Sequence, residues 1–148
     1  MEKQIRRVTL SERVVIGKYV ESSFWEAANQ LGDIRMTMHS CSVEPSSGPL
    51  LIILGRMNGR PTLRGYVGYM IEREISTPLF NLRLPAGEHV ELQVEGRLDD
   101  QLTTISRECG WDFDRVELEF LVNPLDYPEE KLRSIARVPL NQRFHRIA

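Results

Sequence analysis

The chain has 148 residues, of which 41% are hydrophobic and 27% are charged, and its formal net charge is −2. This length is that of one ordinary domain with one core, and the composition is that of a globular protein. The near-neutral charge gives no general attraction to phosphate backbones, so we do not expect direct nucleic-acid binding. The sequence contains no run of eighteen apolar residues and no signal-peptide pattern, so we expect neither a membrane span nor secretion, and a cytoplasmic location.

The first half of the chain predicts four strands and one helix. The strands are rich in β-branched, aromatic or leucine residues and are expected at 5–9, 14–21, 50–54 and 63–74. The third is apolar throughout, which suits a central strand buried on both faces. A helix is predicted from Phe24 to Met38, where apolar residues recur at helical spacing. Ser22 or Ser23 can cap its first turn, and Gly32 is a point at which it can break.

The second half predicts the same kinds of element in the same order. Strands are expected at 82–84, 88–94, 116–122 and 132–138. A helix is expected over 98–109, where apolar residues recur at spacings of three and four, and Gly110 follows as a stop. Residues 116–122 alternate, so Glu117 and Glu119 share the face opposite Val116 and Leu118.

Two segments, 10–21 and 84–95, begin in a similar way. Aligned without a gap, they share leucine at 10 and 84, valine at 20 and 94, and glutamate at 21 and 95. We therefore predict an α+β fold made of two duplicated β-α-β-β units related by a pseudo-twofold axis, with repeats at about 5–76 and 79–140. The seam between such units is a natural place for a pocket.

Several short motifs occur in order along the second half. They are Leu84-Pro-Ala-Gly87, Gly110-Trp-Asp-Phe113, Glu119-Phe120, Asn123-Pro124 and Val138-Pro-Leu140. In this order the sequence resembles the GyrI-like family, the effector-binding domain also found behind DNA-binding domains in AraC-type and MerR-type multidrug regulators. Phe120 stands where the family has the tyrosine of a Glu-Tyr strand, and the first half departs further from the pattern.

This resemblance implies a curved antiparallel sheet with two helices and a central ligand cleft between the two units. Family members bind small molecules there, often cationic or aromatic, and a subset hydrolyses reactive cyclopropane-containing natural products. We therefore expect residues 1–148 to form one standalone effector-binding domain without a cofactor. The expected partner is an aromatic or cationic small molecule.

Glu119 is the predicted carboxylate of the site, because it falls on the glutamate of the family's Glu-Tyr strand. In a partly desolvated, aromatic pocket a carboxylate favours a cation or acts as a general acid or base. Glu117 lies on the same face, and we expect it to be solvent-exposed. The arginines from Arg133 to Arg146 are expected on a solvated strand face and tail.

Aromatic side chains are the predicted walls of the pocket, because they stack on flat ligands and surround cations. The candidates are Tyr19, Phe24, Tyr66, Tyr69, Trp111 and Phe113. Trp111 follows the second helix at once and is the preferred anchor. Cys41, Cys109 and the three histidines lack metal-ligand spacing, so no metal site is expected and the histidines are interpreted as surface or locally hydrogen-bonded.

Two other functions remain open at this stage. One is a hydrolase of strained electrophiles, in which Glu119 orients water or protonates a leaving group. The other is a protein-interaction module, such as a gyrase inhibitor or the partner of a separate regulator, which predicts an exposed apolar patch. The extended segment 63–84 also offers an edge for homodimer pairing.

Overall fold

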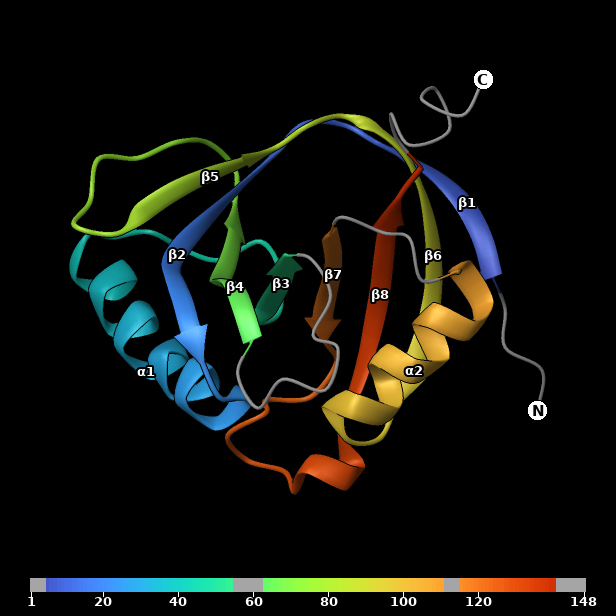
Figure 1. The fold of residues 1–148 in the computed structure, drawn as a ribbon. Helices are drawn as coiled ribbons and strands as arrows, with labels where there is room; N and C mark the ends of the chain where they lie inside the picture. The colour runs from blue at the N-terminus through green and yellow to red at the C-terminus, as the bar shows by residue number, and fades with distance from the viewer. Residues whose placement is uncertain (1–4, 55–62, 111–114, 141–148) are drawn as a thin grey trace.

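The computed structural model describes residues 5–54, 63–110 and 115–140. The strands are β1 (Ile5–Leu10), β2 (Arg13–Ser22), β3 (Leu50–Leu54), β4 (Leu63–Ile71), β5 (Phe80–Leu84), β6 (Gly87–Glu95), β7 (Arg115–Phe120) and β8 (Arg133–Pro139). The helices are α1 (Phe24–Ser40) and α2 (Leu98–Cys109), with a short 3-10 helix at Glu129–Lys131. The eight strands form one curved antiparallel sheet, so the predicted α+β class is confirmed (Figure 1). The predicted turn at 55–61 lies outside the described residues.

The element boundaries follow the sequence signals closely. Ser23 caps α1, because its hydroxyl accepts a hydrogen bond from the Glu26 amide at 3.3 Å and donates one to the Glu26 carboxylate at 3.1 Å. Helix α1 continues through Gly32, which is exposed. Strand β4 ends at Ile71, three residues before its predicted end.

The strand order across the sheet is β1-β6-β8-β7-β3-β4-β2-β5. The first strand of each half of the chain, which we call its leading strand, pairs with the other half: β1 pairs with β6, and β5 pairs with β2 (Figure 1). This is an exchange of leading strands, and it places β1 at the opposite end of the sheet from β2 and β5 at the opposite end from β6. The links from β1 to β2 and from β5 to β6 cross the molecule side by side, with Leu10 opposite Gly87 and Arg13 opposite Leu84. The two ends of the sheet are joined by these paired crossings.

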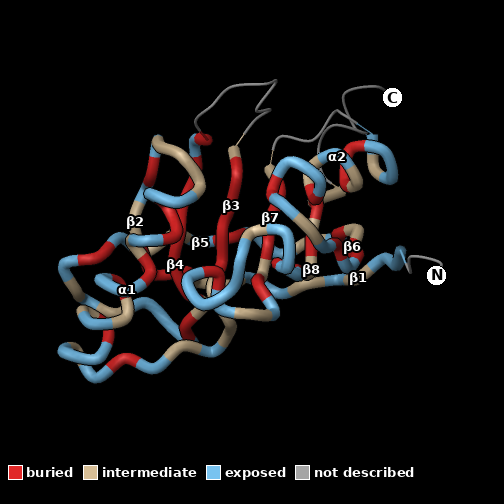
Figure 2. The backbone as a smooth tube through the Cα atoms, turned by 90° about the horizontal axis from the view of Figure 1, so that it is seen from below, coloured by how far each residue is buried: buried red, intermediate tan, exposed pale blue. Residues whose placement is uncertain are grey.

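Both helices cover the same face of the sheet. Ala27, Leu31 and Ile34 of α1 and Leu98 and Ile105 of α2 belong to one buried apolar cluster with side chains from that face. Those side chains include Ile16, Val67, Leu118, Leu92 and Ala136. Figure 2 shows the buried residues concentrated in the middle strands β3, β4, β7 and β8. The opposite face, which we call the helix-free face, has a second and smaller apolar cluster and most of the buried charges.

Strands β2 and β4 approach each other very closely at Gly17 and Gly68, which are opposite in the register. A Cβ atom on Gly17 would lie 2.0 Å from the Val67 carbonyl oxygen, and one on Gly68 would lie 2.0 Å from the Ile16 carbonyl oxygen. Only glycine fits there, because the obstructing atoms are backbone and cannot move aside. The two glycines thus allow the backbones of β2 and β4 to approach this closely.

We expect Gly68→Ala to lower the free energy of unfolding by about 2 kcal/mol or more, since the methyl group forces the two strands apart. Gly32→Ala is the matched control, because nothing lies within 4 Å of its Cβ position and alanine favours a helix by about 0.5–1 kcal/mol. Urea unfolding measures both. Equal changes in the free energy of unfolding for the two substitutions would contradict the close approach of β2 and β4 at Gly68.

Candidate functional site

The helix-free face divides into an apolar part and a charged part. The apolar part lies on β2, β3, β4 and β5 and buries Val15, Leu50, Ile52, Tyr66 and Leu84. The charged part lies on β1, β6, β8 and β7, with Arg13 reaching it from the start of β2. Its members are Arg6, Arg13, His89, Glu91, Arg115, Glu117, Glu119 and Arg137, and we call them the ionic cluster.

Glu117 is the buried centre of the ionic cluster. Arg13 donates two hydrogen bonds to its carboxylate, from Nη1 to Oε1 at 2.6 Å and from Nη2 to Oε2 at 3.1 Å. Arg115 Nη2 lies 3.4 Å from Oε2, and His89 Nε2 lies 3.7 Å from the same oxygen. Because Arg13 is the first residue of β2, directly after the crossing from β1, this ion pair fastens the end of the crossing to the middle of the sheet.

The partners of Glu117 decide its ionisation. Burial raises the pKa of its carboxyl, but His89, Arg13 and the Arg115 charge outweigh burial and lower the pKa from 4.5 to about 2. Glu117 is therefore ionised and fully paired near neutral pH. Both of its oxygens already accept hydrogen bonds from Arg13, so this carboxylate is a structural anchor.

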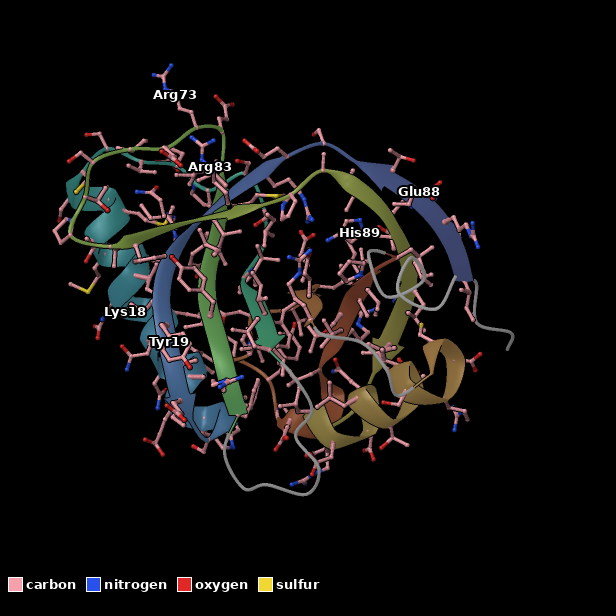
Figure 3. The ribbon with its side chains drawn as sticks, turned by 45° about the horizontal axis from the view of Figure 1, so that its top comes forward. Lys18, Tyr19, Arg73, Arg83, Glu88 and His89 are labelled. Atoms are coloured by element: carbon pink, nitrogen blue, oxygen red, sulfur yellow. The ribbon has the colours of Figure 1, made fainter. Side chains whose placement is uncertain are left out.

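The sequence-based expectation that Glu117 is exposed is wrong. Glu117 is wholly buried because its strand lies in the middle of the sheet, with Ile52 opposite it on one side and Arg137 on the other. His89 is also buried, and its Nδ1 lies 3.0 Å from the Gly87 carbonyl oxygen, so it is locally hydrogen-bonded as one interpretation predicted. Figure 3 shows Glu88 pointing outward from β6 and His89 pointing inward.

Arg137 joins two carboxylates of the ionic cluster. Its Nε donates to Glu91 Oε2 at 2.9 Å and its Nη1 donates to Glu119 Oε1 at 3.0 Å. Glu91 also accepts two hydrogen bonds from Arg6, at 2.9 and 2.6 Å. The expectation of a solvated strand face is therefore wrong for Arg137, because its guanidinium turns onto the sheet and lies between the two acids.

Glu119 is the most accessible acid of the cluster. Its side chain is 20% exposed, against 11% for Glu91 and 1% for Glu117. Besides the bond from Arg137, its Oε2 accepts a hydrogen bond from the Gly48 amide at 3.3 Å. Glu119 also lies opposite Leu50, at the border between the ionic cluster and the apolar part of the face.

The predicted aromatic walls are divided between the two faces. Tyr19 and Tyr66 are opposite each other in the register and lie on the helix-free face, Tyr19 exposed and Tyr66 buried. Tyr69 and Phe24 belong to the cluster beneath the helices, where Tyr69 faces the Arg35 guanidinium at 5.8 Å and Phe24 contacts Phe120. They cannot share a site with Glu119 on the other face. Trp111 and Phe113 lie outside the described residues.

Phe80 is a third aromatic residue of the helix-free face, and the sequence did not single it out. It is exposed, lies opposite Gly17, and its ring meets that of Tyr66 edge-on at 5.9 Å. The Tyr66 hydroxyl donates a hydrogen bond to the Phe80 carbonyl, and burial raises the pKa of that hydroxyl, so it stays protonated. Only the strand exchange brings Phe80 to this position, so no local pattern predicts it.

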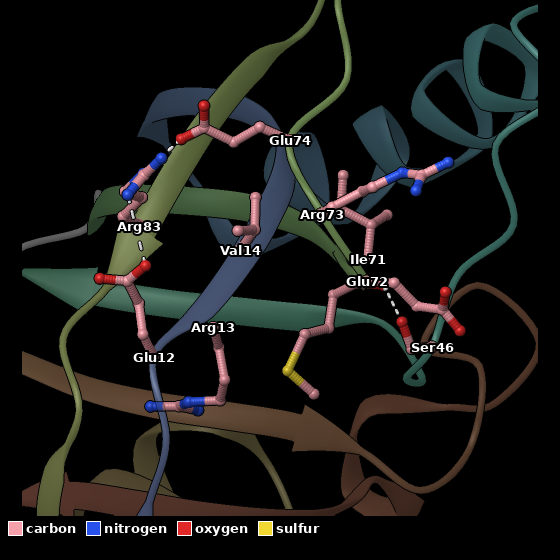
Figure 4. Close-up of a pocket in the computed structure, with 10 residues that line it drawn as sticks. Glu12, Arg13, Val14, Ser46, Ile71, Glu72, Arg73, Glu74 and Arg83 are labelled. Carbon is pink, nitrogen blue, oxygen red and sulfur yellow. Dashed lines mark hydrogen bonds and ion pairs between the residues drawn. The ribbon is translucent and has the colours of Figure 1, made fainter.

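A groove of about 490 Å³ opens where β2 begins and β4 ends, beside Arg73 and Arg83 (Figures 3 and 4). It is lined by Glu12, Arg13, Val14, Ser46, Met70, Ile71, Glu72, Arg73, Glu74 and Arg83. Arg83 is held between Glu12 and Glu74. None of the five predicted site residues that the structure describes lines this groove.

The loop that follows Ser46 connects the groove to Glu119. Ser46 lines the groove, Ser47 Oγ accepts a hydrogen bond from the Met70 amide at 3.0 Å, and the amide of the next residue, Gly48, donates a hydrogen bond to Glu119. Met70 contributes both to the groove and to the edge of the apolar cluster. A flexible thioether side chain thus stands between the open groove and the buried face.

Within the described ranges, no helix has the length and apolar character needed to cross a membrane. The same residues contain no group of three or more His, Cys, Asp or Glu side chains arranged to hold a metal ion.

No protein-family model matches the sequence, and no curated protein matches it. EcmrR in a complex with DNA shares the fold with a TM-score of 0.69 and 9% identity over 93% of this chain, which spans 57% of the EcmrR chain. A hydrolase encoded by lin2189 from Listeria innocua has a TM-score of 0.60 and 13% identity, over 92% of this chain and 91% of that chain. SAV2435 bound to tetraphenylphosphonium has a TM-score of 0.58 and 11% identity over 100% of both chains. These likenesses show the fold, which is consistent with the GyrI-like resemblance.

The depressed pKa of Glu117 predicts acid sensitivity. Since the folded-state pKa is about 2 and the ordinary value is 4.5, the stabilisation is complete above pH 4.5 and is lost as the pH falls toward 2. The loss amounts to about 3 kcal/mol. In Glu117→Gln the free energy of unfolding, measured with urea, should depend less on pH across this window. The exposed control Glu88→Gln should keep the pH dependence of the parent. An unchanged pH dependence in Glu117→Gln would contradict the assignment.

Proposed function

We propose that this chain is a small-molecule-binding protein of the GyrI-like type, acting as one effector-binding domain built from two related units. We further propose that its ligand enters by the groove and reaches Glu119 on the helix-free face. The observation that carries the proposal is the position of Glu119, a half-buried carboxylate that lies opposite Leu50 of the apolar cluster and binds Gly48, two residues after the groove-lining Ser46. Pockets for small molecules combine such apolar surface with a few convergent polar groups.

The volume and composition of the site support an aromatic or cationic ligand. The groove of about 490 Å³ is within the range of small-molecule pockets. Tyr19 and Phe80 place exposed rings on the same face as Glu119, and Met70 can adapt its shape to an incoming ring. SAV2435, which shares the fold, is bound to tetraphenylphosphonium, a cation with four aromatic rings.

Glu119 is the acid of the ionic cluster that suits the role of counter-charge. Glu117 is fully paired and buried, and Glu91 is held by both Arg6 and Arg137. Glu119 has one guanidinium partner, which it shares with Glu91. If a ligand displaces Arg137 from Glu119, Arg137 keeps its hydrogen bond to Glu91 and Glu119 keeps the one from Gly48.

Calorimetry with tetraphenylphosphonium tests the proposal. Glu119→Gln removes the counter-charge and should weaken binding by about tenfold or more, as expected for a charge-assisted contact in a partly buried site. Glu88→Gln, which removes an exposed charge from β6, should bind within twofold of the parent. If Glu72→Gln in the groove weakens binding while Glu119→Gln does not, the groove acids carry the charge and the role of Glu119 fails.

The exposed rings give a second test. Tyr19→Ser should weaken tetraphenylphosphonium binding about two- to fivefold, because an exposed ring contributes about 0.5–1 kcal/mol to a bound cation. Tyr69→Phe removes a hydroxyl from the opposite face and should leave binding unchanged. Weaker binding in Tyr69→Phe with unchanged binding in Tyr19→Ser would place the ligand on the helix-covered face instead.

Hydrolysis is the second candidate, favoured by the fold shared with the hydrolase from Listeria innocua. In this chain Glu119 is the carboxylate to test as general acid or base, since the pKa of Glu117 near 2 keeps that group from carrying a proton near neutral pH. Turnover of a cyclopropane-containing electrophile that is lost in Glu119→Gln would support an enzyme. Stoichiometric binding without product supports a binding protein.

A further inference from the structure

The carboxylate proposed to meet a cationic ligand already has an internal cation. Arg137 Nη1 donates to Glu119 Oε1 at 3.0 Å, and the Arg137 side chain is 14% exposed. A ligand cation that approaches Glu119 therefore meets a guanidinium already bonded to the same oxygen. Two positive groups cannot both occupy this position without repulsion in a partly desolvated site.

The net charge of the ionic cluster strengthens this conflict. The cluster has four arginines, Arg6, Arg13, Arg115 and Arg137, against three carboxylates, those of Glu91, Glu117 and Glu119. Counted without His89, this excess of one positive charge opposes the entry of a further cation. Without Arg137, three arginines would face three carboxylates, and the electrostatic repulsion of a ligand cation would be weaker.

Arg137 has a second carboxylate partner, Glu91, so a ligand can displace it from Glu119. Its Nε donates to Glu91 Oε2 at 2.9 Å, independently of the Nη1 bond to Glu119. When Glu119 is taken by another cation, the guanidinium keeps the Glu91 bond and stays paired. Displacement therefore costs one charge-assisted hydrogen bond, and the arginine is not left as an unpaired buried charge.

We propose that Arg137 is a tethered competitor for the cation position at Glu119, so that it sets the affinity and selectivity of the site. This inference rests on the proposed function, because it concerns the same carboxylate. Monovalent cations without aromatic surface fail to displace the guanidinium. Cations with large aromatic surface succeed, because contacts with the apolar part of the face offset the lost hydrogen bond.

The test compares tetraphenylphosphonium binding to the parent, Arg137→Gln and Arg133→Gln. Arg137→Gln should bind about 10- to 100-fold more tightly, the range that corresponds to one charge-assisted hydrogen bond. Arg133→Gln is the matched control, because it removes the same charge from the same face of β8 at an exposed position, and it should bind within about threefold of the parent. Equal tightening by both substitutions would indicate general electrostatics and overturn the competitor role.

A competition experiment separates direct occupation from structural relaxation. In Arg137→Gln, methylguanidinium at millimolar concentration should occupy the vacated position and weaken tetraphenylphosphonium binding, while in the parent it should have no effect. The absence of competition in the variant would overturn the proposal. If Arg137→Gln does not fold, Arg137→Lys serves instead. Its ammonium cannot span two carboxylates as a guanidinium fork does, so binding should tighten about two- to tenfold, and unchanged or weaker binding would overturn the proposal.

The outcomes also separate this inference from the proposed function. If the parent binds tetraphenylphosphonium and Glu119→Gln weakens it, but Arg137→Gln binds no more tightly, the binding function stands and the competitor role fails. If neither the parent nor Arg137→Gln binds, both fail. If only Arg137→Gln binds, the competitor role is supported in its strongest form, with the parent held closed by its own arginine.

Discussion

The arrangement of this fold depends on the pairing of one buried charge. Glu117 lies in the middle of the sheet with no access to solvent, and an unpaired carboxylate there would cost several kcal/mol. Arg13 supplies the main pairing, and it does so from the point where the chain crosses from one end of the sheet to the other. The crossing, the buried His89 and the part of the groove that Arg13 lines all meet at this contact.

The fold was largely predictable from the sequence, because most of its elements are specified by local patterns. The Ser23 cap, the apolar spacing of both helices and the apolar run of β3 each act over a few residues, and the structure places the elements within three residues of the expected ends. The strand exchange was not predictable in this way. Pairing of β1 with β6 and of β5 with β2 is a long-range property, and no local residue pattern encodes which strand becomes the neighbour.

The site was predictable only in part, for a related reason. Alternation along β7 correctly places Glu117 and Glu119 on one face, but it says nothing about what lies opposite them. Their partners Arg13, His89 and Arg137 come from other strands, so a residue expected in solvent is buried and an arginine expected in solvent is paired. Assigning Tyr66 and Tyr69 to one pocket conflicts with strand geometry, since residues three apart on one strand point to opposite faces.

The crossed leading strands also bear on how the chain folds. Each leading strand needs a partner from the other half of the chain, since β1 pairs with β6 and β5 pairs with β2. Closing such loops costs entropy before the contacts repay it, so formation of this sheet is dominated by contacts distant in sequence and is slow compared with that of a helical protein of equal length. The same exchange makes the two ends of the sheet interdependent: a fragment that stops before β6 leaves β1 without its partner, and one that starts after β2 leaves β5 unpaired.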